Sequence, residues 1–207
     1  MKTEAEQLEA LTEIRKMMKE SSRFVSLSGL SGILAGCYAL AGAAAAHFII
    51  ERSNQGITPE SYTTLTFKLI LLALLVLSVS LLTAFFLSGR KAKRTGHKLF
   101  DHASKKLMWS MAVPLIAGGL ICISLILRGG ALVHLVCPIM LVFYGLALFA
   151  SSRLTLDDIK YLGYLEITLG IVSCFFNGYA LLFWATGFGL LHIIYGTIMW
   201  YRHDRNL

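Results

Sequence analysis

Residues 67–88, FKLILLALLVLSVSLLTAFFLS, decide the fold, because Lys68 at the edge of this stretch is its only ionisable residue. A helix needs about 20 apolar residues to cross roughly 30 Å of hydrocarbon, and this run meets that requirement. It lacks the period-two alternation of a β-barrel strand. We therefore expect a membrane-spanning helix whose solvent is lipid.

The composition extends this expectation to the whole chain. Of 207 residues, 56% are hydrophobic and 15% are charged, whereas an average soluble domain has roughly 25% charged residues. An ordinary soluble enzyme, a disordered chain and a disulfide scaffold are thereby excluded. The sequence predicts an all-α polytopic membrane protein with six transmembrane helices arranged as three hairpins. The predicted spans are about 24–50, 67–88, 107–127, 131–151, 161–176 and 179–201, and the fifth is the shortest.

A separate segment precedes the predicted six-helix domain of residues 23–207. Residues 1–22 are predicted to contain a cytoplasmic amphipathic helix, because Thr3 and Glu6 form a capping-box pattern and apolar residues recur on one face. Its apolar stripe suits either the membrane surface or a protein partner.

The basic residues predict the topology. Of the 19 lysines and arginines, all but Arg52, Lys68 and Arg128 fall on one side of the predicted spans. By the positive-inside rule, both termini are expected in the cytoplasm, in a multi-pass protein of the cell inner (plasma) membrane. This distribution, in short stretches between apolar runs, argues against a nucleic-acid partner. The most basic loop, residues 89–106, is expected to anchor the topology or to contact anionic lipid headgroups, through the side chains of Arg90, Lys91, Lys93, Arg94 and Lys98.

Two predicted hairpins share a pattern of glycine and tyrosine residues, repeated at an offset of 51 residues. Gly119 is followed by Tyr144-Gly145, and Gly170 is followed at the same spacing by Tyr195-Gly196. The pattern indicates a tandem duplication of a two-helix unit, with chance matching of glycines as the alternative. On these glycines the chain resembles small uncharacterised six-span membrane proteins of bacteria, and its last hairpin is similar to the hairpin units of the acid-resistance (HdeD-type) group. The resemblance implies a three-hairpin bundle, and it carries over no activity.

Glu166 is the candidate functional residue, because a carboxylate at membrane depth is costly and normally faces the interior of a bundle. The turn between the last two spans lies near residues 177–179, which places Glu166 and His192 at one level. Tyr164 and Tyr195 are expected close to that level and complete the predicted proton or solute site. The pair is interpreted either as a proton-titrating element or as a structural clamp between two helices.

No enzyme signature accompanies this pair. The sequence has no GxGxxG, P-loop, HExxH or GxSxG motif. His47 and His134 lack an identifiable third ligand for a metal, and the four cysteines are expected to act as small hydrophobes. We therefore expect no catalytic residue, metal or cofactor. Two functions stay open: transport of a small solute or ion, and service as a membrane scaffold or an accessory subunit of a larger complex.

Overall fold

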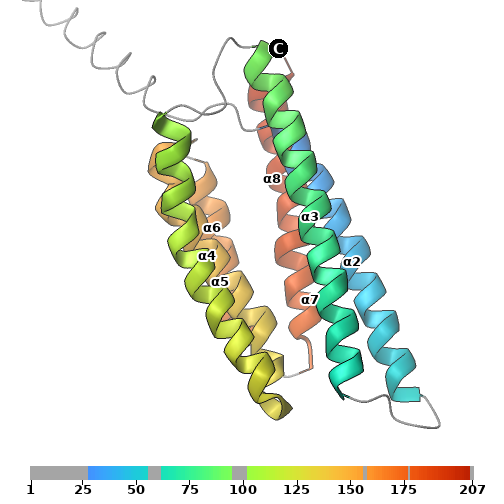
Figure 1. Ribbon diagram of the computed structural model, residues 1–207. Helices are drawn as coiled ribbons and strands as arrows, with labels where there is room; N and C mark the ends of the chain where they lie inside the picture. The colour runs from blue at the N-terminus through green and yellow to red at the C-terminus, as the bar shows by residue number, and fades with distance from the viewer. Residues whose placement is uncertain (1–27, 56–61, 95–101, 156–157, 177, 206–207) are drawn as a thin grey trace, which may run out of the picture.

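The computed structural model describes residues 28–55, 62–94, 102–155, 158–176 and 178–205, which are helical apart from short connections (Figure 1). The predicted amphipathic helix of residues 1–22 lies outside the described residues, as does Lys98. The α-helices are α2 (Gly29–Gln55), α3 (Tyr62–Arg94), α4 (His102–Arg128), α5 (Val136–Ser151), α6 (Ile159–Ser173), α7 (Ala180–Trp184) and α8 (His192–Met199). Four short helical segments with a different winding join or extend these α-helices. Two are 3-10 helices, η1 (Gly130–Leu135) and η2 (Ser152–Leu154), and two are π-helices, η3 (Ala185–Leu191) and η4 (Trp200–Asp204).

Within the described residues, five helical stretches are long and apolar enough to cross a membrane, which makes the chain a multi-pass helical membrane protein. They are Gly29–Asn54, Thr63–Arg94, Ser104–Arg128, Leu132–Leu154 and Ala180–Arg202. Helix α6 has 15 residues, which corresponds to only about 22 Å of helix. The sixth span therefore stays a prediction.

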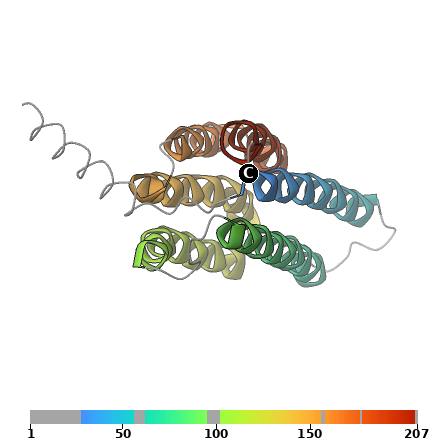
Figure 2. The ribbon, with the colours of Figure 1, turned by 90° about the horizontal axis from the view of Figure 1, so that it is seen from above.

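The helices form two groups of three. In one group α5 lies between α4 and α6; in the other, α2 lies between α3 and the continuous rod of α7, η3, α8 and η4 (Figure 2). The two helices of the last predicted hairpin thus have different main partners, since α6 packs along α5 and α8 packs along α2. Sequence neighbours in this hairpin are divided between the groups.

Glycines explain these partnerships. A Cβ atom added to Gly145 of α5 would lie 2.7 Å from the carbonyl oxygen of Gly163 of α6. Between α2 and α8, a Cβ atom on Gly196 would lie 2.6 Å from the backbone nitrogen of Ile33, and one on Gly32 would lie 3.2 Å from the Cα atom of Gly196. Without a hydrophobic driving force between helices in lipid, such close backbone contact is a main source of packing energy.

The stretch that decides the fold lies on the outside of the second group. The most apolar window of α3 contains no residue buried by the protein, and its large side chains, such as Leu71, Leu75 and Leu82, are exposed. These side chains are suited to contact with acyl chains. Helix α2, with its row of small residues, instead takes the central position of its group.

One end of the structure gathers segments that are distant in sequence. Asp204 accepts hydrogen bonds from Lys91 Nζ at 2.6 Å and from the backbone N–H of Gly29 at 2.7 Å. Arg202 donates to Asp158, just before α6, at 3.1 Å. The start of α2, the end of α3, the start of α6 and the end of η4 therefore share one end of the bundle, as the distribution of basic residues predicts.

The glycine contacts predict a difference between two chemically identical substitutions. Gly196→Ala should lower the free energy of unfolding by about 1–3 kcal/mol, because its methyl group meets backbone atoms of α2 that cannot rotate away. Gly119→Ala is the matched control, since a Cβ atom there has nothing within 4 Å. Thermal and denaturant unfolding in detergent would measure both. Equal stability of the two variants would contradict the close packing of α2 on α8.

Candidate functional site

Glu166 lies in the middle of α6 and is completely enclosed. Its side chain has 0% exposure and sits where α5, α6 and η3 meet. Gly187 of η3 provides the space, because a Cβ atom on that glycine would lie 2.5 Å from Glu166 Oε2 and would also collide with Leu141. The carboxyl group therefore occupies a cavity shaped by the missing side chain of a neighbouring helix.

His192, the first residue of α8, is held from two sides. Its Nδ1 lies 3.0 Å from the carbonyl oxygen of Gly187, and its Nε2 lies 2.7 Å from the hydroxyl oxygen of Tyr144. A carbonyl oxygen only accepts hydrogen bonds, so Nδ1 must carry the hydrogen of this contact. In the neutral imidazole, Nε2 is then the acceptor of the Tyr144 hydroxyl.

The predicted approach of Glu166 to His192 is confirmed, with Oε1 of the carboxyl group 3.5 Å from Nδ1 of the imidazole. The contact is one of charge or dipole and not a hydrogen bond, because the Nδ1 hydrogen is directed at Gly187. Neither oxygen of Glu166 has a hydrogen-bond partner among the described residues. A buried carboxyl group without a hydrogen bond is rare and is itself a sign of function or of an unfilled polar position.

The geometry restricts the charge states that are stable at this site. A lone carboxylate or a lone imidazolium would be an uncompensated charge in an apolar interior, which is strongly unfavourable. A neutral carboxyl beside a neutral imidazole avoids that charge, and so does a carboxylate beside an imidazolium. Both arrangements hold the same number of protons. Gain or loss of one proton by the pair therefore leaves a net charge inside the protein.

Tyr144 is the residue that sequence reasoning missed. It lies on α5, outside the last predicted hairpin, so the depth comparison between residues 166 and 192 did not include it. Its position in the repeat, Tyr144-Gly145 against Tyr195-Gly196, was the available signal. In the structure its ring also lies 4.9 Å from that of Phe188, measured between ring centroids.

The two tyrosines predicted near the site are placed differently. Tyr195 packs against the buried cluster of Leu148, Ile159 and Leu162, and its buried hydroxyl has no hydrogen-bond partner in the described part of the chain. Tyr164 points outward, with half of its surface exposed and its ring against Phe149. The structure thus brings Glu166, His192 and Tyr144 together and leaves Tyr164 at the surface.

The π-helix η3 connects the site to both helix groups. Gly187 faces Leu141 and Glu166 in one group, whereas Gly189 faces Leu40 of α2 in the other. Two glycines in one short segment therefore let it lie against both groups at once. π-Helical turns inside α-helices are frequent at functional sites, and this one ends immediately before His192.

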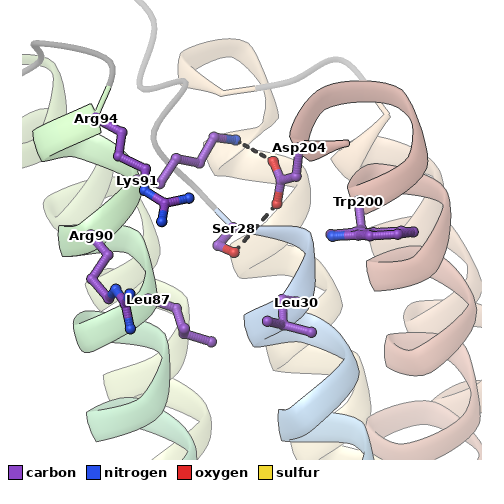
Figure 3. A pocket seen from close by; sticks show the side chains of 8 residues that line it. All are labelled: Ser28, Leu30, Leu87, Arg90, Lys91, Arg94, Trp200 and Asp204. Carbon is purple, nitrogen blue, oxygen red and sulfur yellow. Dashed lines mark hydrogen bonds and ion pairs between the residues drawn. The ribbon is translucent and has the colours of Figure 1, made fainter. Parts of the chain in front are cut away.

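Of the predicted lipid-contacting residues, the four that the structure describes lie at the end of α3 and not in a loop. Arg90, Lys91 and Arg94 line a cavity together with residues of α2 and η4 (Figure 3). Lys93 belongs to the last turn of α3 but does not line this cavity.

The other groups considered in the sequence do not cluster. Within the described ranges, no three His, Cys, Asp or Glu side chains are placed to hold a metal ion. His47 instead lies 3.6 Å from Glu51, one turn later on α2, and both of these side chains are exposed. Cys37, Cys122, Cys137 and Cys174 are free thiols.

Comparison with known proteins adds no relative: no protein-family model, curated protein or solved structure matches the chain. The resemblance to bacterial six-span proteins therefore stays a prediction. The functional argument rests on the geometry of the chain itself.

The contact between Tyr144 and His192 predicts a loss of stability when the hydroxyl is removed. Tyr144→Phe should lower the free energy of unfolding by about 1–3 kcal/mol, because a buried ring nitrogen of His192 loses its partner. Tyr164→Phe, the same change at an exposed position, should alter it by less than about 0.5 kcal/mol. Unfolding of both variants in the same detergent measures the difference. Equal effects would show that the hydroxyl of Tyr144 does not support the site.

Proposed function

We propose that this protein is a small transport or permeation protein whose conformation responds to protonation of the Glu166–His192 pair. The solute is a small molecule or an ion, and its path lies between the two helix groups. The observation that supports this proposal is the complete burial of Glu166, whose Oε1 lies 3.5 Å from His192 Nδ1. Among the described residues, neither carboxyl oxygen of Glu166 has a hydrogen-bond partner. A purely structural clamp would gain more from a direct hydrogen bond.

The proposed response follows from the groups that face Glu166. These are His192 of α8 and Tyr144 of α5, which in turn interacts with Tyr195, and η3 contributes backbone and glycine at this point. Addition or removal of one proton at the pair creates a net charge that the surroundings do not compensate. Separation of α6 from η3 would expose that charge to water. Protonation and opening are therefore coupled by the cost of burying the charge.

The structure corresponds to a closed state in this proposal. Two cavities, both associated with α2 and α3, have volumes of about 300 and 250 Å³, and neither is lined by Glu166 or His192. Access to the pair would require movement of the rod that contains η3. Its π-helical turn is the natural place for such a movement, because a π-turn is a local irregularity in the helix.

We also propose that α6 crosses the membrane as a sixth span. The membrane is the inner membrane of the cell, and both termini lie in the cytoplasm. The support is that α6 runs beside α5 and is followed by α7 at the opposite end of the bundle (Figure 1). The concentration of basic residues at the end shared by Lys91 and Arg202 favours a cytoplasmic location for that end.

This topology predicts the labelling of two single cysteines in a chain whose four native cysteines are replaced. Gly178→Cys lies in the turn before α7 and should react with a membrane-impermeant maleimide added outside intact cells. Arg153→Cys, at the other end of α6, should react only after the cells are opened. Reaction of both positions from the same side would show that α6 does not cross.

Substitution of Glu166 tests the proposed function. Purified protein in liposomes that contain a trapped pH-sensitive dye should admit protons, or a co-transported ion, when a membrane potential is applied. Glu166→Gln removes the ionisable group with little change of shape and should reduce this flux to the level of protein-free liposomes. Glu51→Gln removes an exposed carboxylate of α2 and should leave the flux unchanged.

The pH dependence of the free energy of unfolding provides a second test of Glu166→Gln. When the pair loses its last proton at alkaline pH, wild-type protein buries a lone carboxylate, whereas Glu166→Gln buries none. The variant should therefore retain its stability better than wild type at the alkaline end. At the acidic end the variant should be the less stable, because its imidazolium faces no carboxylate. Identical pH profiles and fluxes for wild type and Glu166→Gln would refute the proposal and favour an accessory role in a larger complex.

A further inference from the structure

A cavity of about 300 Å³ opens where α2 begins, α3 ends and η4 lies beside them (Figure 3). Arg90, Lys91 and Arg94 lie on its α3 side, and Trp200 lies on the opposite wall. These side chains come from segments more than 100 positions apart in the sequence. Only the tertiary structure brings them to one place.

The acidic residue of this cavity is already engaged. Asp204 Oδ1 accepts a hydrogen bond from Lys91 Nζ at 2.6 Å, and Oδ2 accepts from the backbone N–H of Gly29 at 2.7 Å and from the Ser28 hydroxyl at 3.3 Å. Both carboxylate oxygens are therefore occupied in capping α2 and holding α3. In the part of the chain that the structure describes, Arg90 and Arg94 form no ion pair with a carboxylate. The cavity thus carries two guanidinium charges that are not compensated by its own carboxylate.

We propose that this cavity binds the phosphate headgroup of an anionic phospholipid, with Arg90 and Arg94 as the side chains that contact the phosphate. The planar guanidinium group donates pairs of hydrogen bonds that match phosphate oxygens. Trp200 on the opposite wall is 41% exposed, and tryptophan is enriched at the level of lipid headgroups in membrane proteins. The site has the charge and the hydrogen-bond donors that such a headgroup requires, and it lies at the end of the apolar stretch Thr63–Arg94.

The apolar part of the surroundings favours a lipid over a soluble phosphate. Leu30 and Leu87 line the same cavity and lie below Lys91 and Asp204 in Figure 3, farther from the charged end of the helices. Farther along the same two helices lies a second, apolar cavity of about 250 Å³ between α2 and α3, lined in part by Tyr38, Val76 and Val79. Tyr38 follows Leu30 by two helical turns, a rise of about 12 Å. An acyl chain attached to a headgroup at Arg90 would extend toward this groove.

The sequence predicts a contact between residues 89–106 and anionic lipid headgroups, and this cavity is the proposed site of that contact. The phosphate contact is assigned to Arg90 and Arg94, Lys91 has the structural task of holding Asp204, and no part is assigned to Lys93. The proposed site does not depend on Glu166 or on transport, so the two proposals can fail separately.

The test measures binding of phosphatidylglycerol to the purified full-length chain in neutral detergent, by native mass spectrometry and by the shift of the unfolding temperature. Phosphatidylcholine with the same acyl chains is the lipid control, and inorganic phosphate is the soluble control. Wild-type protein should bind phosphatidylglycerol in preference to phosphatidylcholine. Because each basic residue near an anionic surface strengthens binding about fivefold, Arg90→Gln with Arg94→Gln should weaken that binding by roughly 30-fold.

Two further variants separate local contact from general charge. Lys105→Gln with Lys106→Gln removes two exposed charges of α4 that do not line the cavity and should change binding by less than about twofold. Arg90→Lys with Arg94→Lys keeps the charge but loses the guanidinium fork and should give an intermediate loss. If the glutamine variant folds poorly, the lysine variant provides the same comparison.

Two results would overturn the inference. One is an unchanged preference for phosphatidylglycerol in the arginine variants. The other is stabilisation by inorganic phosphate equal to that by the long-chain lipid, which would assign the cavity to a soluble anion.

Discussion

The contact between Glu166 and the bare backbone at Gly187 is the constraint on which the arrangement depends. A carboxyl group inside a bundle surrounded by lipid has no water to solvate it, so the protein must enclose it and define its charge. Here the enclosure is possible because η3 presents a glycine at the point of closest approach, 2.5 Å from Oε2 to a hypothetical Cβ atom. Any side chain at that position would push α6 away from η3 and open the interior of the bundle.

The same physical rule explains why the helices form two groups and not three independent hairpins. In lipid, helices associate where their backbones can come close, and glycines permit this on α5 with α6 and on α2 with α8. The helices of the last sequence hairpin therefore join different groups. Glu166 and His192 belong to opposite sides of this division, so a change at the pair acts on the contact between the groups and not within one of them.

The basic end of the molecule shows how one acidic residue organises a charged surface. Asp204 caps the first turn of α2, where the helix dipole favours a negative charge, and at the same time holds Lys91 of α3 at 2.6 Å. Both oxygens are consumed by these structural contacts. In the described part of the chain, the guanidinium groups of Arg90 and Arg94 form no ion pair with a carboxylate, which is why the proposed phosphate contact is assigned to them.

The sequence by itself determined the lipid solvent, the helical class, the segregation of basic residues and the common level of Glu166 and His192, because hydropathy, charge and helical rise are local or additive properties of a chain. It indicated the small-residue face of α2 for the same reason. Only the tertiary structure decided which helices are neighbours, that Tyr144 of α5 completes the contact of His192, that Tyr164 faces outward, and that Asp204 meets the start of α2. These outcomes depend on where backbones fit closely in three dimensions, and spacing along one hairpin carries no information about a third helix.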